Sequence, residues 1–368
     1  MNKLPIVIVG SGPAGSAAAL TLRRYAPQMQ VILLTDSEKN GVQAVGETLS
    51  PGVLPLLDYI GLRSEFLAAG HLPAGGTASA WGMPEAIERN YIFTGQGQGW
   101  HLDRAAFDAW LLAQAQSAGS TICHGRMSGV ERLDAGWTLN LTSSASEKLQ
   151  AGFLIDATGR SAALARHMGA SIDKHDTLVA MARWYTHDST QKSAEGALVE
   201  GCSDGWWYSA TLPGGRAVAM YMSDADNFKG GAAAREQGWQ SAFSQAPLTR
   251  QRMSGWRVHG DPVLRPANSQ CTSQVAGEAW LAAGDAAAAF DPLASLGIGF
   301  ALRSGMEAAR VAVQAMGGDT GANQAYTDSL HRLYADYRFR LRRIYQSERR
   351  WPASAFWHRR ARQQNELT

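Results

Sequence analysis

The sequence predicts an α/β protein in which a nucleotide-binding domain is interrupted by a β-sheet domain and followed by C-terminal helices. Three observations indicate this arrangement. A glycine-rich turn joins an apolar run to a helical pattern near the start of the chain, and two later apolar runs also end directly in glycine and aspartate. Between residues 178 and 258 the pattern changes to aromatic-rich strands.

The first of these segments has the pattern of a dinucleotide site. An apolar run at residues 6–9 is followed at once by the turn Gly10-Ser11-Gly12-Pro13-Ala14-Gly15. Gly10 allows the tight turn, Gly12 lets the backbone approach a pyrophosphate, and Gly15 lets the following helix pack closely on the strand. Because the N-terminus of that helix faces the phosphates, the segment predicts a Rossmann-like fold.

An acidic residue follows the second strand of this unit. Residues 31–34 form the strand, and Asp36 lies twenty-one residues after Gly15. This is close to the spacing at which a carboxylate hydrogen-bonds the ribose of a dinucleotide. Glu38 is the alternative acid.

Two charged residues near the predicted nucleotide site have open roles. Glu47 lies in a loop, where it is either a solvated carboxylate or a ligand of the nucleotide site. Arg104 follows the predicted N-cap Asp103 in the first turn of a helix, where a cation gains nothing from the helix dipole. It is either solvated or directed at an anion such as a cofactor phosphate, and we favour the anion.

The aromatic and methionine residues of the sheet domain have two interpretations. Runs at residues 206–212 and 217–222 are predicted strands, joined by a hairpin turn at residues 213–215. Their side chains form either ordinary sheet core or an apolar pocket for an aromatic substrate. The pocket interpretation selects Trp81, Trp207, Tyr208 and Met220.

The chain returns to the nucleotide-binding domain through a strand at residues 280–283 that ends in Gly284 and Asp285. A loop at residues 291–299 then leads into a helix. The last helices end in an arginine-rich run at residues 337–362, which we interpret as a solvated face with one packed aromatic side.

These segments give the predicted domain boundaries. The nucleotide-binding domain comprises residues 1–75, 100–170 and 262–320, the sheet domain residues 76–99 and 171–261, and the C-terminal helical segment residues 321–368. A chain of 368 residues is long enough for this division.

Composition and charge argue against several classes of protein. The net charge of +2 does not indicate a nucleic-acid partner, and no apolar run approaches the length of a membrane span. The three cysteines are far apart and form no C-x-x-C pair, so we expect buried thiols. We therefore expect a cytoplasmic enzyme without a structural metal, and no nucleic-acid or membrane partner.

Four separated segments resemble one family. They are the glycine-rich turn, residues 102–108, Asp156-Ala157-Thr158-Gly159 and Gly284-Asp285-Ala286. Their order and spacing resemble the FAD-dependent monooxygenases built like para-hydroxybenzoate hydroxylase. This resemblance implies FAD as the cofactor, with Asp285 on the ribityl chain, Asp36 on the adenine ribose and Arg104 near the pyrophosphate.

The resemblance also bears on two loops, at residues 46–48 and 291–299. The loop containing Gly297, Ile298 and Gly299 would present backbone N–H groups to the pyrimidine end of the flavin. The segments Gly46-Glu47-Thr48 and Asp291-Pro292-Leu293 resemble the flavin-dependent halogenase branch of the superfamily. Glu47, Thr48, Gly284 and Pro292 are accordingly expected among the cofactor-binding residues.

Three departures argue against halogenation itself. Tryptophan halogenases carry a lysine ahead of the tryptophan equivalent to Trp81, whereas this chain has no lysine between Lys39 and Lys148. Ala294 stands where those enzymes place a glutamate. Their Trp-x-Trp-x-Ile-Pro signature is present only in altered form at residues 206–213.

A finer resemblance is to the halogenase-like flavoproteins that mature quinone cofactors. These are the partners of lysine and glycine oxidases containing cysteine tryptophylquinone, and the tryptophan hydroxylase of quinohemoprotein amine dehydrogenase. The Gly-Trp-Trp-Tyr strand at residues 205–208, the loop at 291–298 and residues 348–357 carry it. It implies that the chain uses O2 to hydroxylate a tryptophan side chain in a precursor quinoprotein, an amine or amino-acid oxidase.

The electron donor, the catalytic base and the substrate stay open. Because the chain has no second G-x-G-x-x-G motif, reduced nicotinamide (NADH or NADPH) would bind only transiently. His101 and His259 are candidate bases, although a single histidine is more often structural. The alternative functions are a halogenase or hydroxylase of a small aromatic metabolite, a flavin reductase of the geranylgeranyl reductase type, and a flavin-binding maturation partner without turnover.

Overall fold

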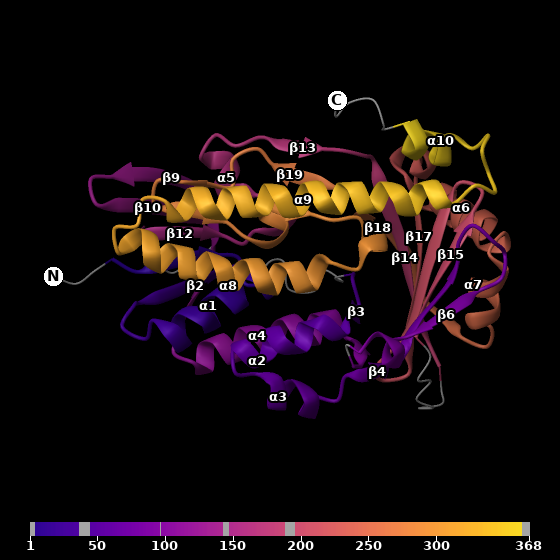
Figure 1. The fold of residues 1–368 in the computed structure, drawn as a ribbon, viewed down its shortest axis with the longest axis horizontal. Coiled ribbons are helices and arrows are strands. Elements are labelled where there is room, and N and C mark those ends of the chain that lie inside the picture. The colour runs from indigo at the N-terminus through magenta and orange to yellow at the C-terminus, as the bar shows by residue number, and fades with distance from the viewer. Residues whose placement is uncertain (1–3, 37–44, 96, 143–146, 188–195, 363–368) are drawn as a thin grey trace.

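The computed structural model describes residues 4–36, 45–95, 97–142, 147–187 and 196–362 (Figure 1). A six-stranded sheet organises the nucleotide-binding half, and a seven-stranded sheet organises the other half. Helix α9 (Ala322–Ser347) runs beside α8 (Gly297–Met316) and reaches towards the large sheet (Figure 1). The predicted α/β class, with an interrupted nucleotide-binding domain and C-terminal helices, is confirmed.

The six-stranded sheet is mostly parallel. In spatial order its strands are β20 (Ala276–Gly277), β21 (Trp280–Ala282), β12 (Phe153–Asp156), β1 (Ile6–Val9), β2 (Val31–Thr35) and β8 (Thr121–His124). Val9 is in register with Asp156, and Asp156 is in register with Ala282. Because parallel strands end at the same edge, the three segments that follow these residues meet there.

The seven-stranded sheet has one face covered by helices. In spatial order its strands are β18 (Arg257–Pro266), β14 (Leu178–Thr186), β17 (Arg216–Asp224), β16 (Gly205–Leu212), β15 (Ala197–Cys202), β5 (Gly76–Ala80) and β6 (Ile87–Asn90). Helices α6 (Ala232–Ser244) and α7 (Pro247–Arg252) pack on the outer face (Figure 1). The predicted hairpin between β16 and β17 is confirmed, and Gly214 and Gly215 take positive φ in its turn.

Three small sheets and the remaining helices complete the described fold. The sheets are β11 (Lys148–Ala151) with β10 (Gly136–Thr142) and β9 (Arg126–Leu133); β13 (Ile172–Lys174) with β19 (Gln270–Thr272) and β22 (Ala288–Ala289); and β3 (Thr48–Leu49) with β7 (Gly99–His101) and β4 (Leu72–Ala74). The helices are α1 (Pro13–Tyr25), α2 (Leu54–Tyr59), α3 (Arg63–Ala68), α4 (Arg104–Ser117), α5 (Ala163–His167) and α10 (Ala355–Arg362). As predicted, the Asp103 carboxylate caps α4 by accepting from the N–H groups of Ala105 and Ala106.

Three strands depart from the predicted domain division. The boundary between residues 99 and 100 falls inside β7, which pairs with β3 and β4 outside the large sheet. The boundary between residues 261 and 262 falls inside β18, which belongs as a whole to the seven-stranded sheet. Strand β13, assigned from the sequence to the sheet domain, instead pairs with β19 outside the large sheet. These departures arise because strand pairing between distant segments leaves no local mark in the sequence.

Among the described residues, no helix is long and apolar enough to cross a bilayer. The same part of the chain contains no group of three or more His, Cys, Asp or Glu residues that could hold a metal ion. Each of the three cysteines lies in the described part of the chain, and none takes part in a disulfide there.

Candidate active site

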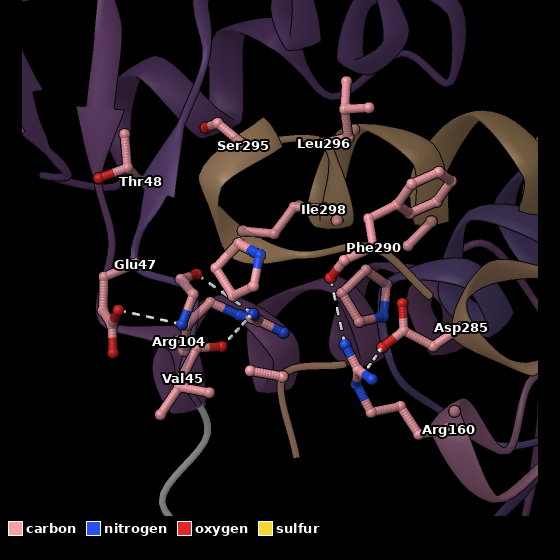
Figure 2. A pocket seen from close by; sticks show the side chains of 18 of the residues that line it. Val45, Glu47, Thr48, Arg104, Arg160, Asp285, Phe290, Ser295, Leu296 and Ile298 are labelled. Atoms are coloured by element: carbon pink, nitrogen blue, oxygen red, sulfur yellow. Dashed lines mark hydrogen bonds and ion pairs between the residues drawn. The ribbon is translucent and has the colours of Figure 1, made fainter. Parts of the chain in front are cut away.

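A cavity of about 340 Å³ lies where the two halves of the molecule meet (Figure 2). On one side it is lined by the glycine-rich turn, the segments after β12 and β21, the loop at residues 45–50 and the N-terminus of α8. On the other side it is lined by sheet residues Ala180, Tyr208, Met220, Met222 and Pro266. The predicted nucleotide loops and part of the predicted substrate strands therefore share one cavity of a size typical of small-molecule sites.

The glycine-rich turn has a shape that side chains would block at two positions. Gly10 has φ +114°, and a Cβ atom there would lie 2.2 Å from the carbonyl oxygen of Ala157. A Cβ atom at Gly15 would lie 1.9 Å from the carbonyl oxygen of Gly10. At Gly12 a Cβ atom would meet no protein atom within 4 Å, so this backbone is open to the cavity. Helix α1 begins at the next residue, with Pro13 and Ala14 also in the lining.

Asp36 lies beside the glycine-rich turn but outside the cavity lining. It follows β2 directly, and the hydroxyl of Thr35 at the end of that strand is 2.7 Å from the hydroxyl of Ser11 in the turn. This position is compatible with a ribose contact beyond the cavity. The alternative acid, Glu38, lies outside the described residues.

Asp285 and Arg160 face each other across the edge of the six-stranded sheet (Figure 2). Arg160 Nε lies 3.6 Å from Asp285 Oδ2, and the same guanidinium donates to the carbonyl oxygen of Phe290 at 3.2 Å. Gly284 precedes Asp285 with φ +60°, and a Cβ atom on it would lie 2.7 Å from Cβ of Ala14. Arg160 was not predicted, although its place directly after Asp-Ala-Thr-Gly was a usable signal.

Glu47 is buried in the loop that borders the cavity, so it is not the solvated carboxylate of one interpretation. It is 2% exposed; its Oε2 accepts from the N–H of Gly46 at 3.0 Å, and its Oε1 has no hydrogen-bond partner. Burial raises the pKa of Glu47 to about 7, against the lowering effects of the Arg104 guanidinium and the Gly46 N–H. Proton uptake by this carboxyl group therefore falls near neutral pH.

Arg104 braces the same loop from α4 (Figure 2). Its Nη1 donates to the carbonyl oxygen of Val45 at 2.8 Å and of Gly46 at 3.2 Å, and its Nη2 pairs with Asp108 at 3.2 Å. The guanidinium also lines the cavity. The side chain is thus held by the protein rather than solvated, and it can offer positive charge to an anionic ligand.

Asp291 joins the cavity to the C-terminal helices. Its Oδ1 accepts from the N–H of Leu293 at 2.8 Å, and its Oδ2 accepts from the hydroxyl of Tyr345 on α9 at 2.7 Å. Burial raises the pKa of Asp291 to about 7, with a further contribution from Asp176. The carboxylate fixes the start of the loop that contains Pro292 and leads to α8.

The loop before α8 presents open backbone to the cavity. The lining includes Pro292, Gly297, Ile298 and Gly299, and α8 begins at Gly297. A Cβ atom at Gly297 would meet no protein atom within 4 Å. The first N–H groups of α8 have no partner within the helix, so this end can donate hydrogen bonds to a ligand.

Two of the four predicted substrate-pocket residues lie elsewhere. Tyr208 and Met220 line the cavity, as predicted. Trp207 is fully buried on the opposite face of the sheet, because neighbouring residues of a strand point to opposite faces and Tyr208 points to the cavity. Trp81 packs beside α9, where its Nε1 donates to the carbonyl oxygen of Ile344 at 2.9 Å. The assignment of Trp207 and Trp81 to the pocket was therefore wrong.

The two candidate histidines have different surroundings. His259 is exposed on the edge strand β18 and does not line the cavity. His101 is fully buried on β7, and its Nδ1 lies 3.0 Å from the hydroxyl oxygen of Thr48. Of the two histidines, His101 is the one whose hydrogen bond, to Thr48, reaches the cavity lining.

The match to a known family follows the same residues. A family model described as an FAD binding domain matches residues 3–332. The chain belongs to this FAD-binding family. Both halves of the cavity fall within the matched region, and the predicted FAD cofactor is confirmed.

Three relatives show where the chain stands in relation to known flavoproteins. LodB of Marinomonas mediterranea, named as an FAD-dependent oxidoreductase, is 30% identical over 366 residues, which cover 98% of this chain and 97% of LodB. The tryptophan 2-halogenase of Chondromyces crocatus is 26% identical over 348 residues, which cover 89% of this chain and 64% of the halogenase. The solved structure of the peptidyl tryptophan dihydroxylase QhpG, essential for tryptophylquinone cofactor biogenesis, has a TM-score of 0.79 at 27% identity, covering 97% of this chain and 78% of QhpG.

These similarities confirm the predicted branch of the flavoprotein monooxygenases, with its halogenase-like members, and show that the chain is a flavin-dependent enzyme. The residues of the cavity fit FAD. Gly12 and Gly297 leave backbone open at two helix N-termini, which suits the anionic and carbonyl-bearing parts of the cofactor. Arg104 and Arg160 add positive charge to the same lining.

Proposed function

We propose that the chain is an FAD-dependent monooxygenase that hydroxylates an indole group, namely a tryptophan side chain of a partner quinoprotein precursor during tryptophylquinone biogenesis. The cavity carries this proposal, because its sheet wall is apolar apart from the Tyr208 hydroxyl and directly faces the FAD-binding loops. Such a wall suits a flat aromatic ring with a single polar N–H group. The similarity to QhpG over 97% of the chain supports the same substrate class.

The placement of FAD is part of the proposal. The pyrophosphate would lie at Gly12 and the N-terminus of α1, near Arg104, with Asp36 on the adenine ribose and Asp285 on the ribityl chain. The flavin ring would lie against the N–H groups at the start of α8. The sheet wall then borders the free side of the ring.

The protein's own contribution is positioning and exclusion of water. When reduced, FAD supplies the activation of O2. Arg160 holds Asp285 in place, and Asp291 fixes the loop before α8. Met220 and Met222 give the substrate ring an apolar surface and keep water from it. Reduced nicotinamide would act as a transient electron donor.

Halogenation is the second candidate, favoured by the 26% identity to a tryptophan 2-halogenase. The chain lacks the lysine and the glutamate that tryptophan halogenases use, since no lysine lies between Lys39 and Lys148 and residue 294 is alanine. In tryptophan halogenases the lysine precedes the tryptophan equivalent to Trp81. Here Trp81 packs on α9 and does not line the cavity. We therefore expect no incorporation of chloride or bromide.

One experiment separates these functions by product mass. The FAD-loaded enzyme is reduced with NADH, or chemically if NADH fails, and mixed with O2, bromide, free indole and the precursor of a quinoprotein oxidase encoded in a neighbouring gene. We expect the precursor to gain the mass of whole oxygen atoms on a tryptophan. Bromine in the product would show halogenation, a gain of two hydrogens would show a reductase, and an unmodified precursor with oxidised free indole would exclude a protein substrate.

A further inference from the structure

We propose that Tyr208, Thr48 and His101 form a proton relay that leads from the substrate wall of the cavity to a buried imidazole. The proposal rests on the hydroxylase function above and names the residues that handle its proton. Tyr208 is the catalytic residue, since it lines the cavity in which the substrate would lie. Thr48 and His101 act through Tyr208 and are positioning residues.

The three side chains form one continuous hydrogen-bonded path. The Tyr208 hydroxyl lies 2.5 Å from the Thr48 hydroxyl, and Thr48 Oγ1 lies 3.0 Å from His101 Nδ1. Thr48 on β3 and His101 on β7 are directly paired strand residues, whereas Tyr208 comes from β16 of the large sheet. The path therefore leads from the seven-stranded sheet to β7, the middle strand of the small sheet that contains β3 and β4.

The polarity of the path fits proton transfer away from the cavity. In one orientation Tyr208 donates to Thr48, and Thr48 donates to His101 Nδ1 in the tautomer protonated at Nε2. The lone pairs of the Tyr208 oxygen are then left to accept a proton from the cavity side. Among the five sheet residues of the lining, Tyr208 alone has a side chain that can both accept and donate.

The environment keeps Tyr208 in the neutral form that such a relay needs. Burial raises the pKa of Tyr208 well above its ordinary value, and the nearby Glu47 carboxyl group acts in the same direction. A stable tyrosinate is therefore unfavourable. Tyr208 can release its proton to Thr48 only while it receives another proton from the substrate. The two proton transfers are therefore coupled.

The proton balance of the step is complete. With reduced FAD and O2 as the oxidant, a C–O bond forms at the substrate ring as an O–O bond breaks, and the ring releases one proton. That proton passes to Tyr208, the Tyr208 proton passes to Thr48, and the Thr48 proton passes to His101. Each bond to hydrogen that breaks is matched by one that forms, and no relay residue is oxidised or reduced.

The charge on His101 is transient. This residue is fully buried, and a buried cation is costly. The proposal assigns the return of the proton to Thr48 and Tyr208, which pass it to the oxygen left by O–O cleavage. The relay begins and ends each turnover with a neutral imidazole.

The first test examines the path without any turnover. The nine histidines are labelled with 15N in the FAD-loaded enzyme, and the His101 signals are assigned with the variant His101→Asn. We expect both Tyr208→Phe and Thr48→Val to shift the His101 Nδ1 resonance, and Thr48→Ser to keep it near the wild-type position. An unchanged His101 Nδ1 resonance in Tyr208→Phe would overturn the relay, whatever reaction the enzyme catalyses.

The second test measures hydroxylation of the quinoprotein precursor by the reduced enzyme in H2O and D2O. We expect Tyr208→Phe and Thr48→Val to lower product formation by about 10²- to 10⁴-fold, the range of general acid–base catalysis, and to remove the solvent isotope effect on that step. Thr48→Ser should recover most of the rate. All rates are compared on enzyme saturated with FAD, because Thr48 is also expected among the cofactor-binding residues.

The control is Tyr221→Phe, which removes a tyrosine hydroxyl from the opposite face of the same sheet. We expect it to hydroxylate at the wild-type rate. If the wild type makes product and Thr48→Val makes it equally fast, the relay is wrong and the hydroxylase stands. If the wild type modifies nothing, the proposed function fails, and the 15N result alone decides whether the path exists.

Discussion

The two faces of the seven-stranded sheet carry similar side chains in different surroundings. On the covered face, Trp207 stacks on Tyr221 with ring centroids 5.1 Å apart and meets Trp239 of α6 edge-on at 4.9 Å. On the cavity face, Tyr208 and Met220 border the FAD-binding loops. Trp207 and Tyr208 are neighbours in sequence, yet one can only stabilise the fold while the other can touch a ligand. The face of the sheet, rather than the residue type, therefore keeps Trp207 away from the cavity.

The largest expected effect comes from the covered face. Trp207→Ala should lower the free energy of unfolding by about 3–5 kcal/mol, because it leaves a cavity among Tyr221, Trp239 and their neighbours. Denaturant unfolding measures this loss. The folded variant should bind FAD and hydroxylate as the wild type does.

Trp207→Phe is the matched control for that variant. The Trp207 Nε1 has no hydrogen-bond partner, so phenylalanine loses volume but no bond. We expect a clearly smaller loss of stability than with alanine. Weak hydroxylation by stable, FAD-loaded Trp207→Phe would contradict the division between the two faces.

Two buried glutamates sharpen the comparison. Glu200, on the covered side, accepts hydrogen bonds from the N–H groups of Leu248 and Thr249 and from the Thr249 hydroxyl, whereas Glu47 beside the cavity has one oxygen without a partner. Between its ordinary pKa of 4.5 and about 7, folded Glu47 keeps a proton that the unfolded chain releases. Its contribution to stability is therefore complete below about pH 4.5 and falls as pH rises through 7.

At 1.36 kcal/mol per pH unit, this fall amounts to about 3 kcal/mol. Glu47→Gln should remove it and make the stability less dependent on pH, as measured by unfolding from pH 4.5 to 8. The pKa of Asp291 is also raised to about 7, so this residue likewise makes the free energy of unfolding fall as pH rises. That part of the pH dependence remains in Glu47→Gln. Glu200→Gln should instead cost about 1–3 kcal/mol across that range. Equal pH profiles for Glu47→Gln and the wild type would refute the assignment.

The smallest expected effect concerns FAD binding by Asp285, which lines the cavity on the side opposite the large sheet. Asp285→Ala should weaken FAD binding by about ten- to a hundredfold, the size expected for loss of a hydrogen bond to a charged group. Flavin fluorescence titration of the folded protein gives the affinity. Asp285→Asn, which keeps the shape and one acceptor, should lose less, and wild-type affinity in Asp285→Ala would show that Asp285 does not hold the cofactor.

The parts of the site that could be predicted from sequence are contiguous. The glycine-rich turn, Gly284 with Asp285, and the loop at residues 291–299 each follow a strand or precede a helix, so local pattern gives their conformation. They meet because parallel strands end at one edge, which a general rule of the fold supplies. The predicted cavity lining on the FAD side came from these motifs.

The relay and the sheet wall depend on distant contacts. Tyr208 lies 160 positions from Thr48, and His101 lies 53 positions from Thr48, in strands of two different sheets. No local pattern states that these sheets meet. Alternation along the strand alone implies that Trp207 and Tyr208 point to opposite faces of the sheet. Which of the two residues faces the cavity depends on where α6 packs, and the sequence does not show that.

The most direct test of the central claim is the fate of 18O2. The reduced, FAD-loaded enzyme is mixed with 18O2 and the neighbouring-gene quinoprotein precursor, and the precursor is digested and mapped by tandem mass spectrometry. The account predicts 18O on a tryptophan side chain with the wild type and with Trp207→Phe, and almost none with Tyr208→Phe. Equal labelling by Tyr208→Phe, or 18O found only in hydrogen peroxide or a free small molecule while the precursor stays unlabelled, would contradict it.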